Sequence, residues 1–313
     1  MSLSTLKEPS AVEDARPRRP LLTIRRRRAA QGLGYAAPTA AVVSVFFLAP
    51  LVLVVWMSLN HWPLLGNPTL SFPTNYTDIG DNTLFRGAVW FTLRYTVVMT
   101  VVLFSVAFGL ALLVQNRRRG VGFLRTAFFL PAAVGFATAS LLFLGLLSNE
   151  IGPVNPLLTH LGIISRPVSW ISGSPNTALG STVALVTWRF AGFNMLILLT
   201  GLQAIPVELY EAARMDGANR VQILRRITVP LMRPTIALVL IMMITGSLLA
   251  FDQFYILTGG GPDNSTTSVV MVIVREAFVR FNLGSAAAIS VAVLGVLVAL
   301  NVVQLSILRR RSR

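Results

Sequence analysis

The sequence predicts an all-α integral membrane protein with six transmembrane helices. Its 313 residues are 54% hydrophobic and only 12% charged, and the mean hydropathy is +0.69. Long apolar segments in a chain of this composition are typical of membrane spans. The segments are continuously apolar and do not alternate with polar residues, so helices are favoured over the strands of a membrane barrel.

Each of six apolar segments is long enough to cross a bilayer core of about 30 Å, which needs about 20 helical residues. No charge occurs between Arg28 and Asp78, the fourth span carries Arg189, and the fifth carries Asp252. The first apolar segment is too long for the core of a signal peptide, so we expect it to be an uncleaved span. Prolines within spans are expected to produce kinks that neighbouring helices absorb. We expect spans at about 36–59, 95–116, 126–148, 178–203, 234–257 and 284–308, with Pro38, Pro50 and Pro131 inside them.

The basic residues predict the orientation of these spans. Of the 27 Lys and Arg residues, 21 lie in the N-terminal arm, the turn with Arg117–Arg119, the loop after the fourth span and the C-terminal tail. Only four lie in the alternate segments. Because cytoplasmic loops carry the excess of Lys and Arg, we expect both termini to be cytoplasmic. The net charge of +15 is then mostly a consequence of topology, with some affinity for anionic lipids, and argues against a nucleic-acid ligand.

We expect three parts along the chain. Residues 1–34 form a basic arm, residues 35–308 form the six-span domain, and residues 309–313 form a basic tail. The first 28 residues of the arm are expected to be disordered or to lie on the lipid surface. Two outward loops, 60–90 and 148–177, are rich in turn residues. Within the second, Leu157–Ile164 is too short to span and is either an interfacial helix or a packed loop.

Several kinds of chemistry are excluded by what the sequence lacks. Lys7 is the only lysine, so no phosphate-binding loop ending in Gly-Lys-Ser/Thr can exist. The chain has no cysteine, and His61 and His160 are far apart in sequence, which argues against a metal site. No catalytic motif of a hydrolase or a metalloprotease is present. Any energy for work must therefore come from another chain.

The cytoplasmic loop 204–233 is expected to form two short helices joined at a glycine. Pro206 suits a first helical turn, with Glu208 and Glu211 near the positive end of the helix dipole. Gly217 can adopt the left-handed conformation that ends a helix. The alternative is an amphipathic loop that packs against the ends of the spans.

This loop resembles the EAA loop of the permease subunits of ABC importers, and we call residues 204–233 the EAA loop. The glycine-rich segment Gly259–Pro262, with Ser265–Thr267 behind it, is similar to the MalF/UgpA-like branch of the carbohydrate-uptake permeases. The resemblance covers roughly 34–308. The residues that carry it in the EAA loop, and that by resemblance contact the ATPase, are Glu211, Ala212, Ala213, Asp216, Gly217, Ala218, Ile227 and Pro230.

The resemblance implies a type I ABC-importer permease fold with cytoplasmic coupling helices, located in the bacterial plasma (inner) membrane. It implies a second, MalG/UgpE-like permease subunit, two ATP-binding subunits, an extracytoplasmic solute-binding protein and surrounding lipid as partners. The chain would bind no cofactor itself, because ATP and Mg belong to the ATPase subunits, and it would not be an enzyme. Alternating access then moves the spans around a site near the midplane.

The resemblance also places the substrate site on the fourth and fifth spans. Aromatic faces with a few polar groups suit a sugar, so a di- or oligosaccharide is the expected substrate. Arg189 is a departure, since a guanidinium matches phosphate: it indicates either an importer of glycerol phosphate or a glycerophosphodiester, or a structural ion pair with Asp252, for which Arg94 competes. The candidate substrate residues are Trp188, Arg189, Phe193, Asn194, Phe251, Asp252 and Gln253.

Three other functions remain as alternatives from the residues alone. An ion-coupled secondary transporter would need ionisable residues at the midplane and internal repeats. A channel would need a filter or a ring of pore-lining groups, and a membrane enzyme would need a catalytic constellation. Co-purification of an ATPase with the chain would separate the importer from all three.

Overall fold

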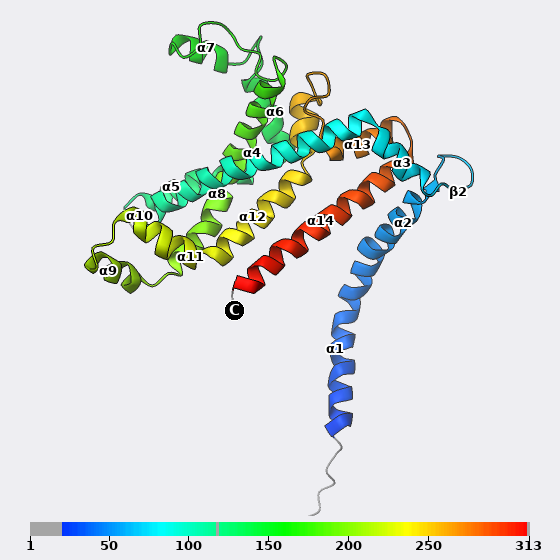
Figure 1. Ribbon diagram of the computed structural model, residues 1–313, viewed down its shortest axis with the longest axis horizontal. Coiled ribbons are helices and arrows are strands. Elements are labelled where there is room, and N and C mark those ends of the chain that lie inside the picture. Colours follow the sequence, from blue (N-terminus) through cyan, green and yellow to red (C-terminus); the bar gives the residue numbers. More distant parts are fainter. Residues whose placement is uncertain (1–20, 117–118, 312–313) are drawn as a thin grey trace, which may run out of the picture. The chain divides into compact units, whose positions relative to one another are not determined.

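The computed structural model describes residues 21–116 and 119–311. The chain divides after Leu53 into two compact units, which are described separately below. Figure 1 shows the elements coloured along the sequence. The expectation for the first 20 residues of the arm lies outside the described residues.

The first unit is helical throughout its described part. It contains α1 (Leu21–Val43), the π-helical turn η1 (Ser44–Leu48) and the start of α2 (Ala49–Ser58). Helix α1 begins at Leu21 and so includes the end of the segment 1–28, which we expected to be disordered or on the lipid surface. Pro50 follows η1 and cannot donate a backbone hydrogen bond, so the wider π turn lies where the regular helical pattern is interrupted.

The second unit begins with a small hairpin. Strands β1 (Asn60–His61) and β2 (Thr69–Leu70) pair antiparallel, and α3 (Thr74–Asp81) follows. Residues 60–90, which we expected to be a turn-rich loop, therefore contain regular elements, and α4 (Thr83–Val114) begins well before the span expected at 95–116. The Asn82 side chain caps α4 by accepting from the Leu84 and Phe85 amides at 2.9 and 3.2 Å, a local signal that the hydropathy pattern does not show.

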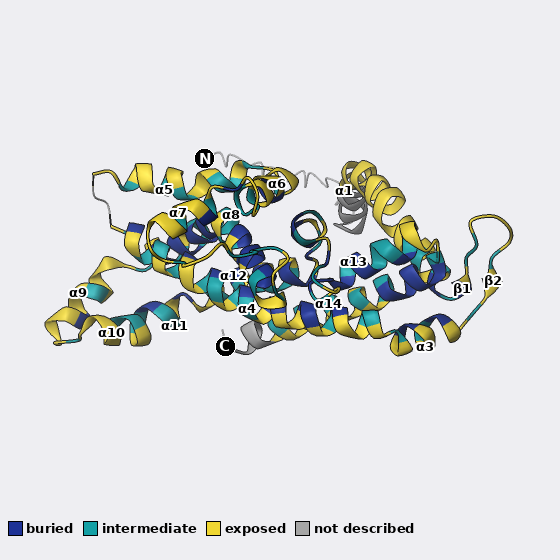
Figure 2. Ribbon diagram, turned by 90° about the horizontal axis from the view of Figure 1, so that it is seen from above, coloured by how far each residue is buried: buried dark blue, intermediate teal, exposed yellow. Residues whose placement is uncertain are grey.

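The core lies where α4, α8 (Pro175–Gln203) and α12 (Arg233–Leu248) cross. Figure 2 shows buried residues concentrated around these helices, whereas α9 and α10 are largely exposed. Tyr95 and Phe254 are fully buried and meet edge to face, with ring centroids 4.8 Å apart. Small residues bring helices close together: a side chain at Gly192 of α8 would overlap the backbone of Phe128.

The third expected span, 126–148, is not one straight helix. It consists of α5 (Val121–Phe129), the 3-10 turn η2 (Leu130–Ala133) and α6 (Phe136–Leu146), bent by 96°. Pro131 lacks an N–H, and Val134 has an extended backbone, so the regular helix ends there and a new one starts after Gly135. The kink expected from Pro131 is thus a complete break.

The fifth expected span, 234–257, is also shorter than expected. Helix α12 ends at Leu248, and the chain turns before the π-helical segment η4 (Phe254–Thr258). Before α12, a second bent pair of 73° joins Arg220–Leu231 to Arg233–Leu248. The break after Leu248 places polar residues of this segment at a cavity described below.

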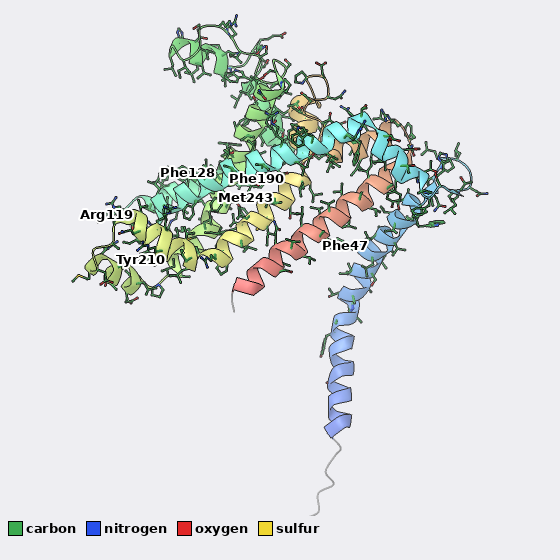
Figure 3. The ribbon with its side chains drawn as sticks, viewed as in Figure 1. Phe47, Arg119, Phe128, Phe190, Tyr210 and Met243 are labelled. Atoms are coloured by element: carbon green, nitrogen blue, oxygen red, sulfur yellow. The ribbon has the colours of Figure 1, made fainter. Side chains whose placement is uncertain are left out.

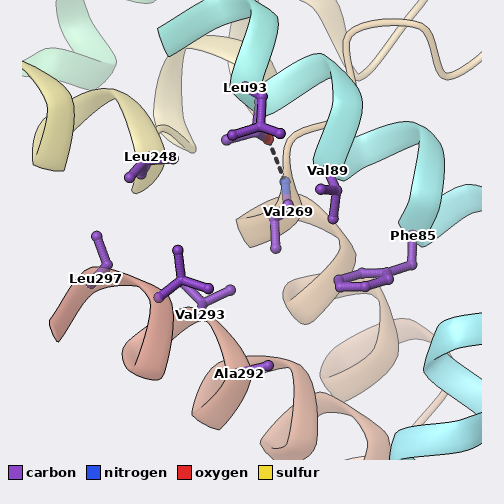
Figure 4. Close-up of a pocket in the computed structure, with 10 residues that line it drawn as sticks. Phe85, Val89, Leu93, Leu248, Val269, Ala292, Val293 and Leu297 are labelled. Carbon is purple, nitrogen blue, oxygen red and sulfur yellow. Dashed lines mark hydrogen bonds between the residues drawn. The ribbon is translucent and has the colours of Figure 1, made fainter. Parts of the chain in front are cut away.

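The last helix, α14 (Leu283–Arg311), covers the range expected for the sixth span and packs against α3 and α12. Between α12 and α14 in the chain lies a helix that we did not expect, α13 (Val269–Val274) continued by η5 (Arg275–Val279). An apolar groove of about 120 Å³ between α4, α12, α13 and α14 is lined by Phe85, Val89, Leu93, Leu248 and Val293 among others (Figure 4). In it the Val269 amide donates to Thr92 Oγ1 at 3.1 Å.

The loop 148–177, expected to face outward, contains a short helix, α7 (Val154–His160), where we left a helix or a packed loop open. The helix starts earlier than the apolar stretch Leu157–Ile164. Buried Asn155 organises the loop, since its amide donates to the Val168 carbonyl and its oxygen accepts from the Val168 amide and the Trp170 indole.

By length and composition, four helices among the described residues can cross a membrane. The number becomes six if each bent pair forms one span. The four are Gly34–Ser58, Thr83–Val114, Pro175–Gln203 and Leu283–Ser306.

Candidate functional site: the EAA loop and a central cavity

The EAA loop forms two helical segments joined by a turn. The first is α9 (Val207–Met215), and the second consists of α10 (Arg220–Ile223), η3 (Leu224–Thr228) and α11 (Val229–Leu231). Figure 1 shows them beside α5 at one end of α4. The Tyr210 and Thr228 hydroxyls lie 3.3 Å apart and connect the two segments (Tyr210 is labelled in Figure 3).

Gly217 makes the turn between the segments. Its φ is +77°, in the left-handed region that residues with a Cβ avoid. The Ala218 amide donates to the Ala213 carbonyl and the Gly217 amide to the Arg214 carbonyl, at 2.9 and 3.0 Å. This pattern is a Schellman motif, which satisfies the last carbonyls of α9. The expected conformation of Gly217 is therefore confirmed by the backbone.

The second segment starts with a capping box that we did not predict. Asn219 Oδ1 accepts from the Gln222 amide at 2.9 Å, and Gln222 Oε1 accepts from the Asn219 amide at 2.8 Å. Asn219 is therefore the N-cap of this segment. The π turn η3 ends two residues before Pro230, as η1 does before Pro50.

The EAA residues present an exposed surface to the outside of the chain. Glu211, Ala212, Asp216 and Gly217 are exposed, whereas Ala213 is buried. Ala218, Ile227 and Pro230 are half-buried. Behind them lies a cavity of about 870 Å³ lined by the ends of α4 and α8 and by both segments of the loop. The motif is thus exposed on one side, while its other side faces a cavity that the ends of α4 and α8 also line.

A second cavity, of about 320 Å³, lies at the crossing of α4, α8 and α12, and α6 also contributes to it. We call it the central cavity. Its aromatic lining is Tyr95, Phe136, Phe190, Phe193 and Phe251, and its polar lining is Asn194, Ser247, Asp252 and Gln253. Figure 3 labels Phe190 and Met243, which also line it.

Five of the seven candidate substrate residues line the central cavity: Phe193, Asn194, Phe251, Asp252 and Gln253. Gln253 is buried and its Nε2 donates to the Tyr95 hydroxyl at 3.3 Å. Asn194 is buried, and its Nδ2 donates to the Phe190 carbonyl at 2.9 Å. The amide groups of α8 and of the segment after α12 are therefore held in place at the cavity wall.

Trp188 and Arg189 do not line the central cavity. Trp188 packs against Phe143 of α6, with centroids 5.6 Å apart. Arg189 Nε donates to the Val134 carbonyl at 3.0 Å. Its guanidinium carbon lies 4.7 and 4.5 Å from the ring centroids of Phe136 and Phe190.

The ion pairs considered from the sequence do not form. Among the described residues, Arg189 and Asp252 make no salt bridge, and the Arg94 guanidinium instead donates to Asn176 Oδ1 at 2.9 Å. Both arginines therefore find uncharged acceptors. Spacing along the helices cannot show the direction in which these side chains point.

Several cavity residues were missed from the sequence. Tyr95, Phe136, Phe190, Met242 and Met243 line the cavity from four different elements. Phe190 could have been found, because it is one helical turn before Asn194 and so lies on the same face. Phe136 could not, since its position depends on the break between α5 and α6.

The glycine-rich segment after η4 is a tightly bonded loop. Gly259 and Gly260 have φ of +57° and +86°. Arg275 of η5 donates to Asn264 Oδ1 at 2.7 Å and to the Gly259 carbonyl at 3.3 Å. Thr266 Oγ1 donates to the Gly261 carbonyl at 2.6 Å. Arg275 thereby attaches the glycine-rich loop to η5, the continuation of α13. The sequence did not predict this role of Arg275.

A helical membrane chain with a polar and aromatic cavity and an exposed helix-turn-helix at one end defines a transport subunit. Residues 33–313 match the family described as the binding-protein-dependent transport system inner membrane component. The chain belongs to this family. It is thus a non-catalytic membrane component of an ABC transport system.

Individual relatives agree with this assignment. The chain is 31% identical to the sulfoquinovosyl glycerol transport system permease protein SmoG of Agrobacterium fabrum, over 88% of this chain and 89% of SmoG. It is 34% identical to the trehalose/maltose transport system permease protein MalF of Thermococcus litoralis, over 80% of this chain and 84% of MalF.

A solved structure shows the same fold. A chain of a bacterial ABC transporter involved in the import of the acidic polysaccharide alginate matches with a TM-score of 0.82. The identity is 22%, and the match covers 94% of this chain and 100% of the other. The overall fold of this chain is therefore that of a known ABC-importer permease.

Proposed function

We propose that the chain is the permease subunit of an ATP-driven, binding-protein-dependent importer of a sugar, specifically a di- or oligosaccharide. The central cavity is the observation that carries this proposal. It combines five aromatic rings with the amides of Asn194 and Gln253 and the carboxylate of Asp252. Aromatic faces pack against sugar rings, and a few oriented polar groups bind hydroxyls. Relatives named for the transport of sugars support the same substrate class.

The proposal includes a division of labour between subunits. Six spans, counting each bent pair as one, pack against a second MalG/UgpE-like permease subunit, and both termini are cytoplasmic. Two ATP-binding subunits hold ATP and Mg and receive Glu211, Ala212 and the neighbouring EAA residues. A solute-binding protein delivers the sugar from outside. Closure of the ATPase subunits moves the EAA loop, and the spans then change from inward-open to outward-open.

The lining of the cavity favours a neutral sugar over glycerol phosphate or a glycerophosphodiester. An anionic substrate would need a cation in the wall, and Arg189 was the candidate. Its guanidinium donates to the Val134 carbonyl and contacts two phenylalanine rings. The charged side chain that does line the cavity is the carboxylate Asp252, which would repel a phosphate.

Two measurements test this proposal. A tagged version of the chain should co-purify an ATPase, which an ion-coupled transporter, a channel or a membrane enzyme would not do. The partner binding protein should gain thermal stability with a di- or oligosaccharide and not with glycerol phosphate or a glycerophosphodiester. If only glycerol phosphate or a glycerophosphodiester stabilised the binding protein, the substrate would be anionic and the proposed sugar would be wrong.

A further inference from the structure

We propose that Arg189 is a positioning residue, which holds the bend between α5 and α6 and thereby places two aromatic rings of the central cavity. The claim about the bend depends only on the contacts of this chain. The claim about substrate affinity rests on the proposed function.

The break in the third span leaves backbone that needs a partner. Val134 is extended, with φ −73° and ψ 131°, and it lies between η2 and the start of α6. Non-helical backbone at membrane depth is tolerated where protein groups satisfy it. Arg189 Nε supplies this bond to the Val134 carbonyl at 3.0 Å.

The same guanidinium contacts one aromatic ring directly after the break and one on α8. Phe136 is the first residue of α6, and Phe190 follows Arg189 on α8. Their ring centroids lie 4.7 and 4.5 Å from the guanidinium carbon and 5.7 Å from each other. A cation over aromatic faces is favourable, and more so away from water. Both rings line the central cavity, whereas Arg189 does not.

The other half of the bend is held one helical turn away. At Gly192 the backbone of Phe128 in α5 approaches α8 so closely that a side chain would overlap it. Residues three apart lie on the same face of a helix. One face of α8 therefore holds α5 through Gly192 and the start of α6 through Arg189, and the angle between the two is set by α8.

These contacts explain how a charged arginine is accommodated near the middle of an expected span. An arginine at the middle of a membrane helix costs free energy unless protein groups surround it. Arg189 is half-buried and its planar donor group bonds a carbonyl while its faces contact rings, which a lysine cannot reproduce. The Arg189→Lys substitution thus keeps the positive charge and removes the planar donor group.

The experiment uses spin labels on the two arms of the bend in the assembled complex. Cysteines replace Phe123 of α5 and Leu142 of α6, whose side chains are 77% and 47% exposed, and the natural chain has no cysteine to interfere. Arg189→Lys, Arg189→Gln and Phe136→Leu are compared with the natural sequence. Ala184→Ser is the control on the same helix, because Ala184 of α8 is exposed and does not line the central cavity.

We expect both Arg189 variants to broaden the distance distribution between the labels, and Phe136→Leu to broaden it less. In the same complexes the KM for sugar uptake should rise about five- to tenfold, with maximal rate less affected. Ala184→Ser should change neither the label distances nor the KM. If Arg189→Gln does not assemble, Arg189→Lys and Phe136→Leu decide.

An unchanged label distance in the Arg189→Lys complex would overturn the proposal. If the KM were raised in that complex, Arg189 would be a substrate ligand. If the KM were also unchanged, Arg189 would have neither role. A broadened distance with an unchanged KM would refute the link to affinity. The label measurement needs no sugar, so it stands even if the transported solute proves to be something else.

Discussion

The EAA loop and the central cavity are built by different kinds of interaction. The EAA loop is held by contacts between residues close in sequence, such as Ala218 to Ala213 and Asn219 to Gln222. The central cavity depends on residues far apart in sequence, such as Gln253 and Tyr95, or Arg189 and Val134. A turn that is held by short-range contacts can be predicted from the sequence, and it can move as a unit. The wall of a cavity forms only when helices from distant parts of the sequence pack together.

This difference also separates the proposed roles. A segment that transmits motion from an ATPase needs a defined turn and an exposed face, and Gly217 and the exposed Glu211 provide them. A substrate site needs side chains whose positions are determined by several elements. Four predictions follow from this contrast, beginning with the largest effect.

The EAA loop and the loop 148–177 should lie on opposite sides of the membrane. Single cysteines at Met215 of the EAA loop and at Ile151 of the outward loop occupy positions that are 88% and 84% exposed. A membrane-impermeant thiol reagent added to intact cells should label the cysteine at Ile151 and not the one at Met215, because basic loops are retained inside. Permeabilised cells, in which both should react, are the control. Labelling of Met215→Cys alone would invert the topology.

Gly217→Val should uncouple the EAA loop. A β-branched residue at φ +77° costs about 1–2 kcal/mol, although no neighbouring atom obstructs the Cβ. Stimulated ATP hydrolysis and uptake should fall together by about tenfold or more, while the chain still inserts. Gly217→Asn is the matched control, because asparagine tolerates the left-handed conformation, and it should keep most of the activity. Equal activity of the valine and asparagine variants would show that this turn does not carry the coupling.

The cavity pair Tyr95 and Gln253 should behave as a coupled unit. Gln253→Leu leaves the buried Tyr95 hydroxyl without its donor, at a cost of about 1–3 kcal/mol. Tyr95→Phe removes the other partner, and the double variant should be more stable than the sum of the single changes suggests. Thermal unfolding of the four purified complexes measures this coupling. Strict additivity would mean that the hydrogen bond contributes nothing.

The smallest effect is expected at the glycine-rich loop. Arg275→Gln removes charge-assisted bonds to Asn264 and Gly259 and should lower the stability of the complex by about 1–2 kcal/mol. Arg86→Gln, at an exposed position, is the control and should change stability by less than about 0.5 kcal/mol. A thermal shift no larger than that of the control would remove Arg275 from the loop's support.

Hydropathy and charge predicted the helical membrane class, and local cap chemistry predicted the turn at Gly217. The breaks at Val134 and after Leu248 were not predicted, because the apolar pattern continues across both. Helix α13 was missed since its six apolar residues are too few to register as a span. Five of the seven candidate residues line the central cavity, because the segments that the resemblance indicated meet there. The Arg189 side chain does not line it, since it points to the bend at Val134.

The central claim is that a sugar is moved through this chain by ATP hydrolysed elsewhere. Its most direct test is uptake of a labelled di- or oligosaccharide into proteoliposomes that contain the complete complex. We expect accumulation when ATP is inside and the loaded binding protein is outside, and none when either is omitted or when Gly217 is replaced by valine. Accumulation without ATP, driven by an imposed proton or sodium gradient, would contradict the account.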